Sequence, residues 1–166
     1  MKNHKLFTLI ILFLIPFYLT GCISIGISSS PEPAKNLNYE PPKEPFKAHK
    51  IKTGDKVWLS EKTGNSISFI SDCSPNSDPS LEALEADALS GIENIEVQET
   101  NTLEYNQRKA KKTVANGSVD GIKIKVKVIS FKKNSCNYNL LFAGKQERFE
   151  SELSNFDKFA ESFKAP

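Results

Sequence analysis

The chain has 166 residues, of which 22 are Lys or Arg and 20 are Asp or Glu, so its formal net charge is +2 at pH 7. Two of the lysines lie within the first 21 residues, and the remaining 145 residues carry 20 basic and 20 acidic side chains. A balanced charge gives no indication of nucleic-acid binding. We expect no nucleic-acid partner mainly because the start of the chain indicates export.

The first 21 residues have the layout of a secretory signal peptide. Two lysines precede an apolar run over residues 6–19 that Pro16 interrupts, and this run is shorter than the roughly 20 residues of a membrane-spanning helix. The sequence LTGC at residues 19–22 resembles the bacterial lipobox, in which the Cys receives diacylglycerol and the chain is cut in front of it. The resemblance implies that the mature protein starts at Cys22 and is anchored to a membrane by acyl chains such as palmitate. The alternative is an ordinary signal peptide with a coincidental Cys.

The residue after Cys22 bears on the destination of the protein. Ile23 stands where Asp would retain a lipoprotein in the inner membrane. For a cell with two membranes we therefore expect an outer-membrane anchor and a domain in the periplasm. In a cell with one membrane the domain would face outward.

Two further cysteines, Cys73 and Cys136, remain after Cys22. An even pair in an oxidising compartment predicts a disulfide. Closing a loop of this length would contribute roughly 4 kcal/mol of stability on the chain-entropy argument. The alternative is two reduced, buried thiols. Without a neighbouring His or more Cys, the pair does not suggest a metal site.

The composition divides the exported chain into two parts. Five of the nine prolines and a run of three serines fall within residues 23–48. Such a segment cannot bury enough apolar surface to offset its ordering entropy. We therefore predict a lipidated Cys and a Pro/Ser-rich tether over residues 22–50, with a reach of about 30 to 80 Å, followed by one domain over residues 51–166.

The first half of this domain contains two strands, a helix and a third strand. The strands at residues 57–59 and 66–70 are joined by a turn at residues 63–65. A helix is expected to begin with Asp78 as N-cap and Pro79 as its first residue, and to end before Gly91. The alternation at residues 95–98 predicts another strand.

The second half is dominated by hairpins. Residues 122–128 alternate between aliphatic side chains and lysines, which predicts a strand with one apolar face. A turn at Asp120-Gly121 pairs it with a strand through residues 113–115, and a turn at residues 134–135 leads to a strand over residues 138–142. Ser154 is the expected N-cap of a last helix, with Asp157 completing a capping box. This order predicts an α+β fold, an antiparallel sheet with helices packed on it.

A lipobox and a Pro-rich segment precede this order of elements, which closes with Phe149 and the sequence FDKFAESF at residues 156–163. Over residues 54–165 the chain resembles the fold shared by the photosystem protein PsbP and the DcrB-type bacterial envelope lipoproteins. The resemblance implies an α/β/α sandwich. It also implies a binding or assembly module of the cell envelope.

No pattern of catalytic residues is recognisable in the exported chain. Its single histidine, His49, lies at the predicted border between tether and domain, where a general base would lack a positioned partner. We therefore expect a protein without catalytic residues, cofactor or metal that binds an envelope protein. A hydrolase with an unrecognised site is an alternative.

The order of charges suggests a second alternative. Residues 63–107 contain nine acids and no base, whereas residues 108–133 contain nine bases and one acid. Lys123, Lys125 and Lys127 share one face of their strand and form a candidate anion-binding face for anionic lipid or lipopolysaccharide. The competing interpretation is a solvated sheet face whose lysines deter aggregation and balance the acidic helix.

Overall fold

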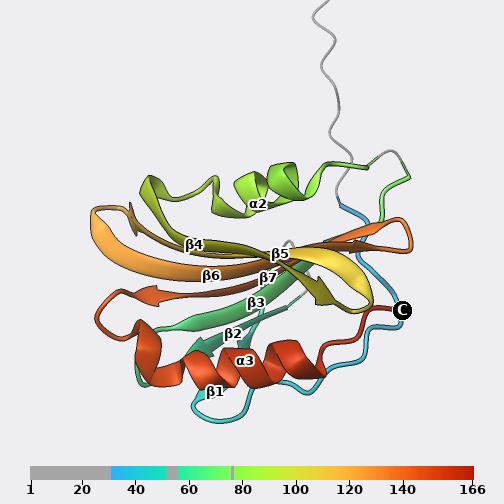
Figure 1. Cartoon of the computed structure of the whole chain (residues 1–166). Helices are drawn as coiled ribbons and strands as arrows, with labels where there is room; N and C mark the ends of the chain where they lie inside the picture. Colours follow the sequence, from blue (N-terminus) through green and yellow to red (C-terminus); the bar gives the residue numbers. More distant parts are fainter. Residues whose placement is uncertain (1–30, 52–55, 76) are drawn as a thin grey trace, which may run out of the picture.

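A computed structural model describes residues 31–51, 56–75 and 77–166 of the chain. Seven strands form one antiparallel sheet in the order β1-β2-β3-β7-β6-β5-β4, with α2 on one face and α3 on the other (Figure 1). The predicted α+β fold is confirmed. The elements are β1 (Phe46–His49), β2 (Lys56–Ser60), β3 (Ser66–Asp72), α2 (Leu81–Leu89), β4 (Glu93–Tyr105), β5 (Arg108–Val119), β6 (Ile122–Lys133), β7 (Cys136–Lys145), the 3-10 helix η1 (Phe149–Glu152) and α3 (Leu153–Ser162).

The larger core lies between the sheet and α3 and is mainly aromatic. From α3 and the residue after it, Phe156, Phe159 and Phe163 are at most 2% exposed. They pack against Trp58 of β2 and Phe69 of β3, whose rings lie 5.4 Å from Phe159 and 5.2 Å from Phe163, respectively. The stripe of phenylalanines therefore holds the C-terminal helix on the sheet.

A smaller aliphatic core lies under α2. Leu89 of α2 packs on Ala115 of β5 and on Val126 and Val128 of β6. Because side chains of a strand alternate between faces, β6 sends Ile129 to the aromatic core instead. One strand thus contributes to both cores.

Three tight turns connect β4 to β7. Asn106-Gln107, Asp120-Gly121 and Asn134-Ser135 all have positive φ values, as a two-residue turn of the I′ type requires. The turns predicted at Asp120-Gly121 and at residues 134–135 are confirmed. They force four consecutive strands into neighbouring places in the sheet.

Both predicted helix starts are displaced. Helix α2 is capped by Ser80, whose hydroxyl accepts a hydrogen bond from the Ala83 N–H, instead of by Asp78. Asp78 is drawn away because it pairs with Lys132 of β6. Helix α3 begins at Leu153, so Ser154 lies inside its first turn, and α3 has no side-chain cap. The preceding 3-10 helix feeds directly into α3 and makes a capping box unnecessary.

The predicted tether is wrong for residues 31–50. Ala34, Leu37 and Tyr39 pack against the aromatic core. Phe46 is 4% exposed at the start of β1, a strand that the sequence interpretation missed. The few apolar residues between the prolines are therefore enough to hold this segment on the domain, which begins by Pro31.

Candidate interaction surfaces

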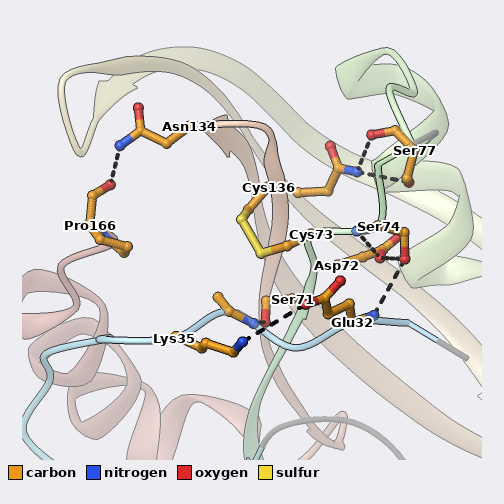
Figure 2. The surroundings of a disulfide bond; sticks show 12 residues. Glu32, Lys35, Ser71, Asp72, Cys73, Ser74, Ser77, Asn134, Cys136 and Pro166 are labelled. Carbon is orange, nitrogen blue, oxygen red and sulfur yellow. Dashed lines mark hydrogen bonds and ion pairs between the residues drawn. A yellow bond between two sulfur atoms is a disulfide. The ribbon is translucent and has the colours of Figure 1, made fainter.

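The predicted disulfide between Cys73 and Cys136 is present, with an S–S distance of 2.03 Å. It joins the end of β3 to the start of β7 (Figure 2). Residues 31–34 run beside it: the Cys73 N–H donates to the Glu32 carbonyl at 2.8 Å, and the Ala34 N–H donates to the Ser71 hydroxyl at 2.7 Å. The disulfide thus braces the place where the N-terminal segment meets the sheet.

Asp72 adds a polar anchor next to the disulfide. Partial burial by itself would raise the pKa of its carboxyl. The hydrogen bonds from the hydroxyl and N–H of Ser74 lower this pKa, Ser77 acts in the same direction, and together they outweigh the effect of burial. The net pKa of Asp72 is below its ordinary value. The carboxylate therefore stays ionised and orders the turn after β3.

The C-terminus lies at the same end of the sheet. Asn106, in the β4–β5 turn, accepts a hydrogen bond from the Ala165 N–H at 3.0 Å. Asn134, in the β6–β7 turn, donates to the Pro166 carbonyl at 2.8 Å. We call this end the attachment end; it comprises residues 31–35, 73, 106–107, 134–136 and 164–166, and Figure 1 shows the C-terminus there beside residues 31–40.

The candidate anion-binding face lies on the side of the sheet that α3 covers. Lys125 pairs with Glu150 and Lys127 with Asp157, each at 2.6 Å. Their ammonium groups also sit over aromatic rings of the core, Lys125 at 5.1 Å from the Phe149 centroid. Lys123 is exposed next to the β5–β6 turn, at the end of the sheet opposite the attachment end. The three lysines share a face as expected, but carboxylates of the same chain already compensate two of them.

The acidic and basic blocks of the sequence fold against each other. Glu85 of α2 is half-buried and forms an ion pair with Lys111 of β5. Lys112 of the same strand pairs with Glu99 of β4 at 3.5 Å. The acidic helix α2 is therefore balanced by Lys111 of β5, whereas Lys125 and Lys127, on the opposite face of the sheet, pair with acids of η1 and α3.

Strand β4 is the least protected edge of the sheet. It is thirteen residues long, and every residue except Leu103 and Tyr105 is exposed. Natural edge strands are usually short or carry Lys or Pro. The opposite edge, β1, follows this rule with four residues that include Lys47, whereas β4 contains neither Lys nor Pro and has four glutamates.

The half of β4 next to its turn is regular. Irregular pairing with β5 is confined to the stretch between Glu93 and Glu99, and from there the register runs unbroken to the Tyr105–Arg108 pair that closes the turn. In an antiparallel ladder, residues alternately point their backbone groups toward and away from the neighbouring strand. The backbone groups of Tyr105 point toward β5, because Tyr105 and Arg108 close the two-residue turn. The N–H and C=O groups of Thr100, Thr102 and Glu104 therefore point away from β5, toward the open edge.

A buried carboxylate that sequence reasoning missed links the β2–β3 turn to η1. Glu152 is 5% exposed and accepts hydrogen bonds from the hydroxyl groups of Ser60 and Thr63 and from the Asn65 amide, at 2.9, 2.5 and 3.0 Å respectively. A glutamate in a polar stretch such as ESE resembles any surface residue. Only its three distant partners show that the role of Glu152 is structural.

A polar surface groove of about 490 Å³ lies between α3 and the strands β4 to β6. Tyr105 and the Lys127–Asp157 pair line it. Burial raises the pKa of the Tyr105 phenol, which donates a hydrogen bond to the Ala160 carbonyl. These groups are engaged in holding α3 on the sheet.

Trp58 and Tyr138 are core residues, at 5% and 1% exposure, and do not line a surface groove. His49 is exposed on β1. Cys22 and the predicted signal peptide lie outside the described residues. Within residues 31–51, 56–75 and 77–166, no helix has the length and apolar content needed to cross a membrane.

No protein-family model and no curated protein sequence matches the chain. Solved structures that share its fold include the following three. LpqN of Mycobacterium tuberculosis, described as involved in cell envelope biogenesis, aligns with a TM-score of 0.58 and 11% identity over 84% of this chain and 88% of its own. The cyanobacterial PsbP protein CyanoP of Synechocystis aligns with a TM-score of 0.55 and 14% identity, over 89% of this chain and 99% of its own.

The third structure, a Pseudomonas aeruginosa protein of unknown function, aligns with a TM-score of 0.52 and 6% identity over 68% of this chain and 91% of its own. At these identities the similarity is one of fold. The DcrB part of the sequence resemblance stays a prediction. The domain therefore has a PsbP-like α+β fold, which it shares with a protein of mycobacterial envelope biogenesis.

Proposed function

We propose that this chain is a cell-envelope lipoprotein, anchored through Cys22 to the outer membrane, whose periplasmic domain binds a protein partner and catalyses no reaction. Three observations support the location. The LTGC motif supports lipidation, the Cys73–Cys136 disulfide fits an oxidising compartment, and the shared fold with LpqN fits an envelope role.

The open edge of β4 is the observation that carries the binding role. Its outward backbone groups at Thr100, Thr102 and Glu104 offer a template for strand addition, in which an extended segment of a partner extends the sheet. Four glutamates and no base in β4 favour a segment with basic side chains. The same charges disfavour a second copy of this chain, because antiparallel pairing of β4 with itself sets acids against acids.

Binding of anionic lipid on the lysine face is the weaker candidate. Docking there would compete with the pairs Lys125–Glu150 and Lys127–Asp157, so a phosphate would have to displace carboxylates that are already in place. We therefore propose the protein partner.

The decisive experiment uses the full-length protein in its own membranes. A photoreactive amino acid replaces Gln98 of β4, and a control probe replaces Ala48 of the other edge strand; both positions are exposed. We expect a crosslinked protein from position 98 only. Thr102→Pro should abolish the crosslink because it removes an outward N–H while sparing the ladder with β5, and Thr102→Val should retain it. Equal crosslinking from both edges, or a crosslink that survives Thr102→Pro, would refute docking at β4.

A further inference from the structure

Only a short segment of chain connects the proposed lipid at Cys22 to the folded domain. Pro31, the first described residue, lies nine residues after Cys22. A fully extended chain spans at most about 3.6 Å per residue, so this connection reaches no further than about 30 Å. This reach is far below the 80 Å expected for a tether that ran to residue 50.

The connection cannot lengthen without breaking contacts of the folded domain. The hydrogen bonds that Glu32 and Ala34 share with the end of β3 lie beside the disulfide. Further along, Asn38 exchanges backbone hydrogen bonds of 3.1 and 2.7 Å with Lys164. The Tyr39 ring lies within 5.2 to 5.9 Å of four aromatic rings of the core. The residues from Glu32 to Tyr39 therefore add nothing to the reach of the connection.

The short connection joins the domain at one end of its long axis. Glu32, the disulfide, the β4–β5 turn and the C-terminus all belong to the attachment end. The β5–β6 turn at Asp120-Gly121 lies at the other end. Strand β6 runs between these ends with 12 residues, and the eleven steps from its first to its last residue correspond to about 36 Å at 3.3 Å per step.

We propose that the lipidated protein keeps its attachment end within about 30 Å of the bilayer surface and directs the β5–β6 turn away from it. This orientation rests on the lipidation of Cys22 put forward above. It also places the regular half of β4, which ends at the turn of residues 106–107, beside the membrane. The proposed partner strand is therefore an extended segment that lies next to the same membrane surface.

Two matched positions test the orientation. Gln107 and Asp120 both lie in two-residue turns with positive φ, at 62° and 50°, and both are exposed. A fluorescent amino acid at either position serves as the donor. The full-length lipidated protein is reconstituted in vesicles of phosphatidylcholine and phosphatidylglycerol that carry an acceptor on a lipid headgroup. We expect strong energy transfer from position 107 and a loss of most of that transfer at position 120.

A longer connection provides the control. Twelve Gly and Ser residues inserted after Ser30 raise the upper limit of the connection to about 75 Å, and transfer from position 107 should fall. Equal transfer from both positions, or no response to the insertion, would overturn the orientation. The intact mass of the same preparation separates the two proposals: a mass without diacylglycerol at Cys22 would overturn the anchor and the orientation together, whereas equal transfer from lipidated protein overturns the orientation alone.

Discussion

Glu152 should contribute several times more to stability than Glu150, its neighbour in η1. The two residues share an element and a side-chain type but differ in environment. Glu152 is 5% exposed and accepts three hydrogen bonds, whereas the Glu150 side chain is 65% exposed and forms a single ion pair with Lys125.

The magnitude follows from the donors that Glu152→Ala leaves behind. An unsatisfied buried donor costs about 1–3 kcal/mol. The hydroxyl groups of Ser60 and Thr63 can rotate to other acceptors, and Asn65 keeps its bond to the Arg148 carbonyl at 3.1 Å, so the three penalties do not add fully. We expect a net loss of about 3 kcal/mol, which lowers the Tm by roughly 10 °C for a domain of this size.

Two further variants complete the comparison. Glu152→Gln keeps the shape of the side chain but turns an amide N–H₂ toward donors, and should cost about 1–2 kcal/mol. Glu150→Ala should cost at most about 0.5 kcal/mol, as an exposed ion pair does. Urea unfolding at neutral pH measures all three. The error of such measurements is about 0.5 kcal/mol. If the losses of unfolding free energy in Glu152→Ala and Glu150→Ala differed by no more than this, the reasoning about the buried carboxylate would be wrong.

Three other outcomes follow from the same contacts. Replacing Cys73 and Cys136 together by Ser should lower the free energy of unfolding by about 4 kcal/mol in urea titrations, because the bond closes a 63-residue separation; an unchanged midpoint would contradict this. Tyr39→Ala should cost about 2–3 kcal/mol and expose residues 31–45 to proteolysis, which a tether would already permit in the wild type. Because the folded pKa of Asp72 lies below its ordinary value of 3.8, its contribution is present above pH 4 and is lost as the pH falls through the folded pKa. Asp72→Asn should therefore be less stable than the wild type at neutral pH and equal to it at the acid end, and a constant difference would refute that assignment.

Local pattern was sufficient for much of the fold. The alternation over residues 122–128 and the turn residues Asp120-Gly121 specify a hairpin without reference to the rest of the chain, because side-chain period and positive φ are properties of a few neighbours. The cysteine count likewise predicted the disulfide, since only two cysteines remained after Cys22. The first residues of the helices were harder to predict from the sequence. Asp78 is a good N-cap by type, but a lysine 54 positions away competes for its carboxylate.

The sequence by itself determined the antiparallel α+β order, the hairpins and the cysteine pair, because each depends on residues close together in the chain or on a simple count. Tertiary structure alone decided which charges are available and where the domain begins. Lys125 and Lys127 meet acids 25 and 30 positions away, and Tyr39 meets rings that arrive from β2, β3 and α3. The composition of residues 31–50 is too polar to form a core of its own, and in the structure its few apolar side chains pack on a core that distant segments provide.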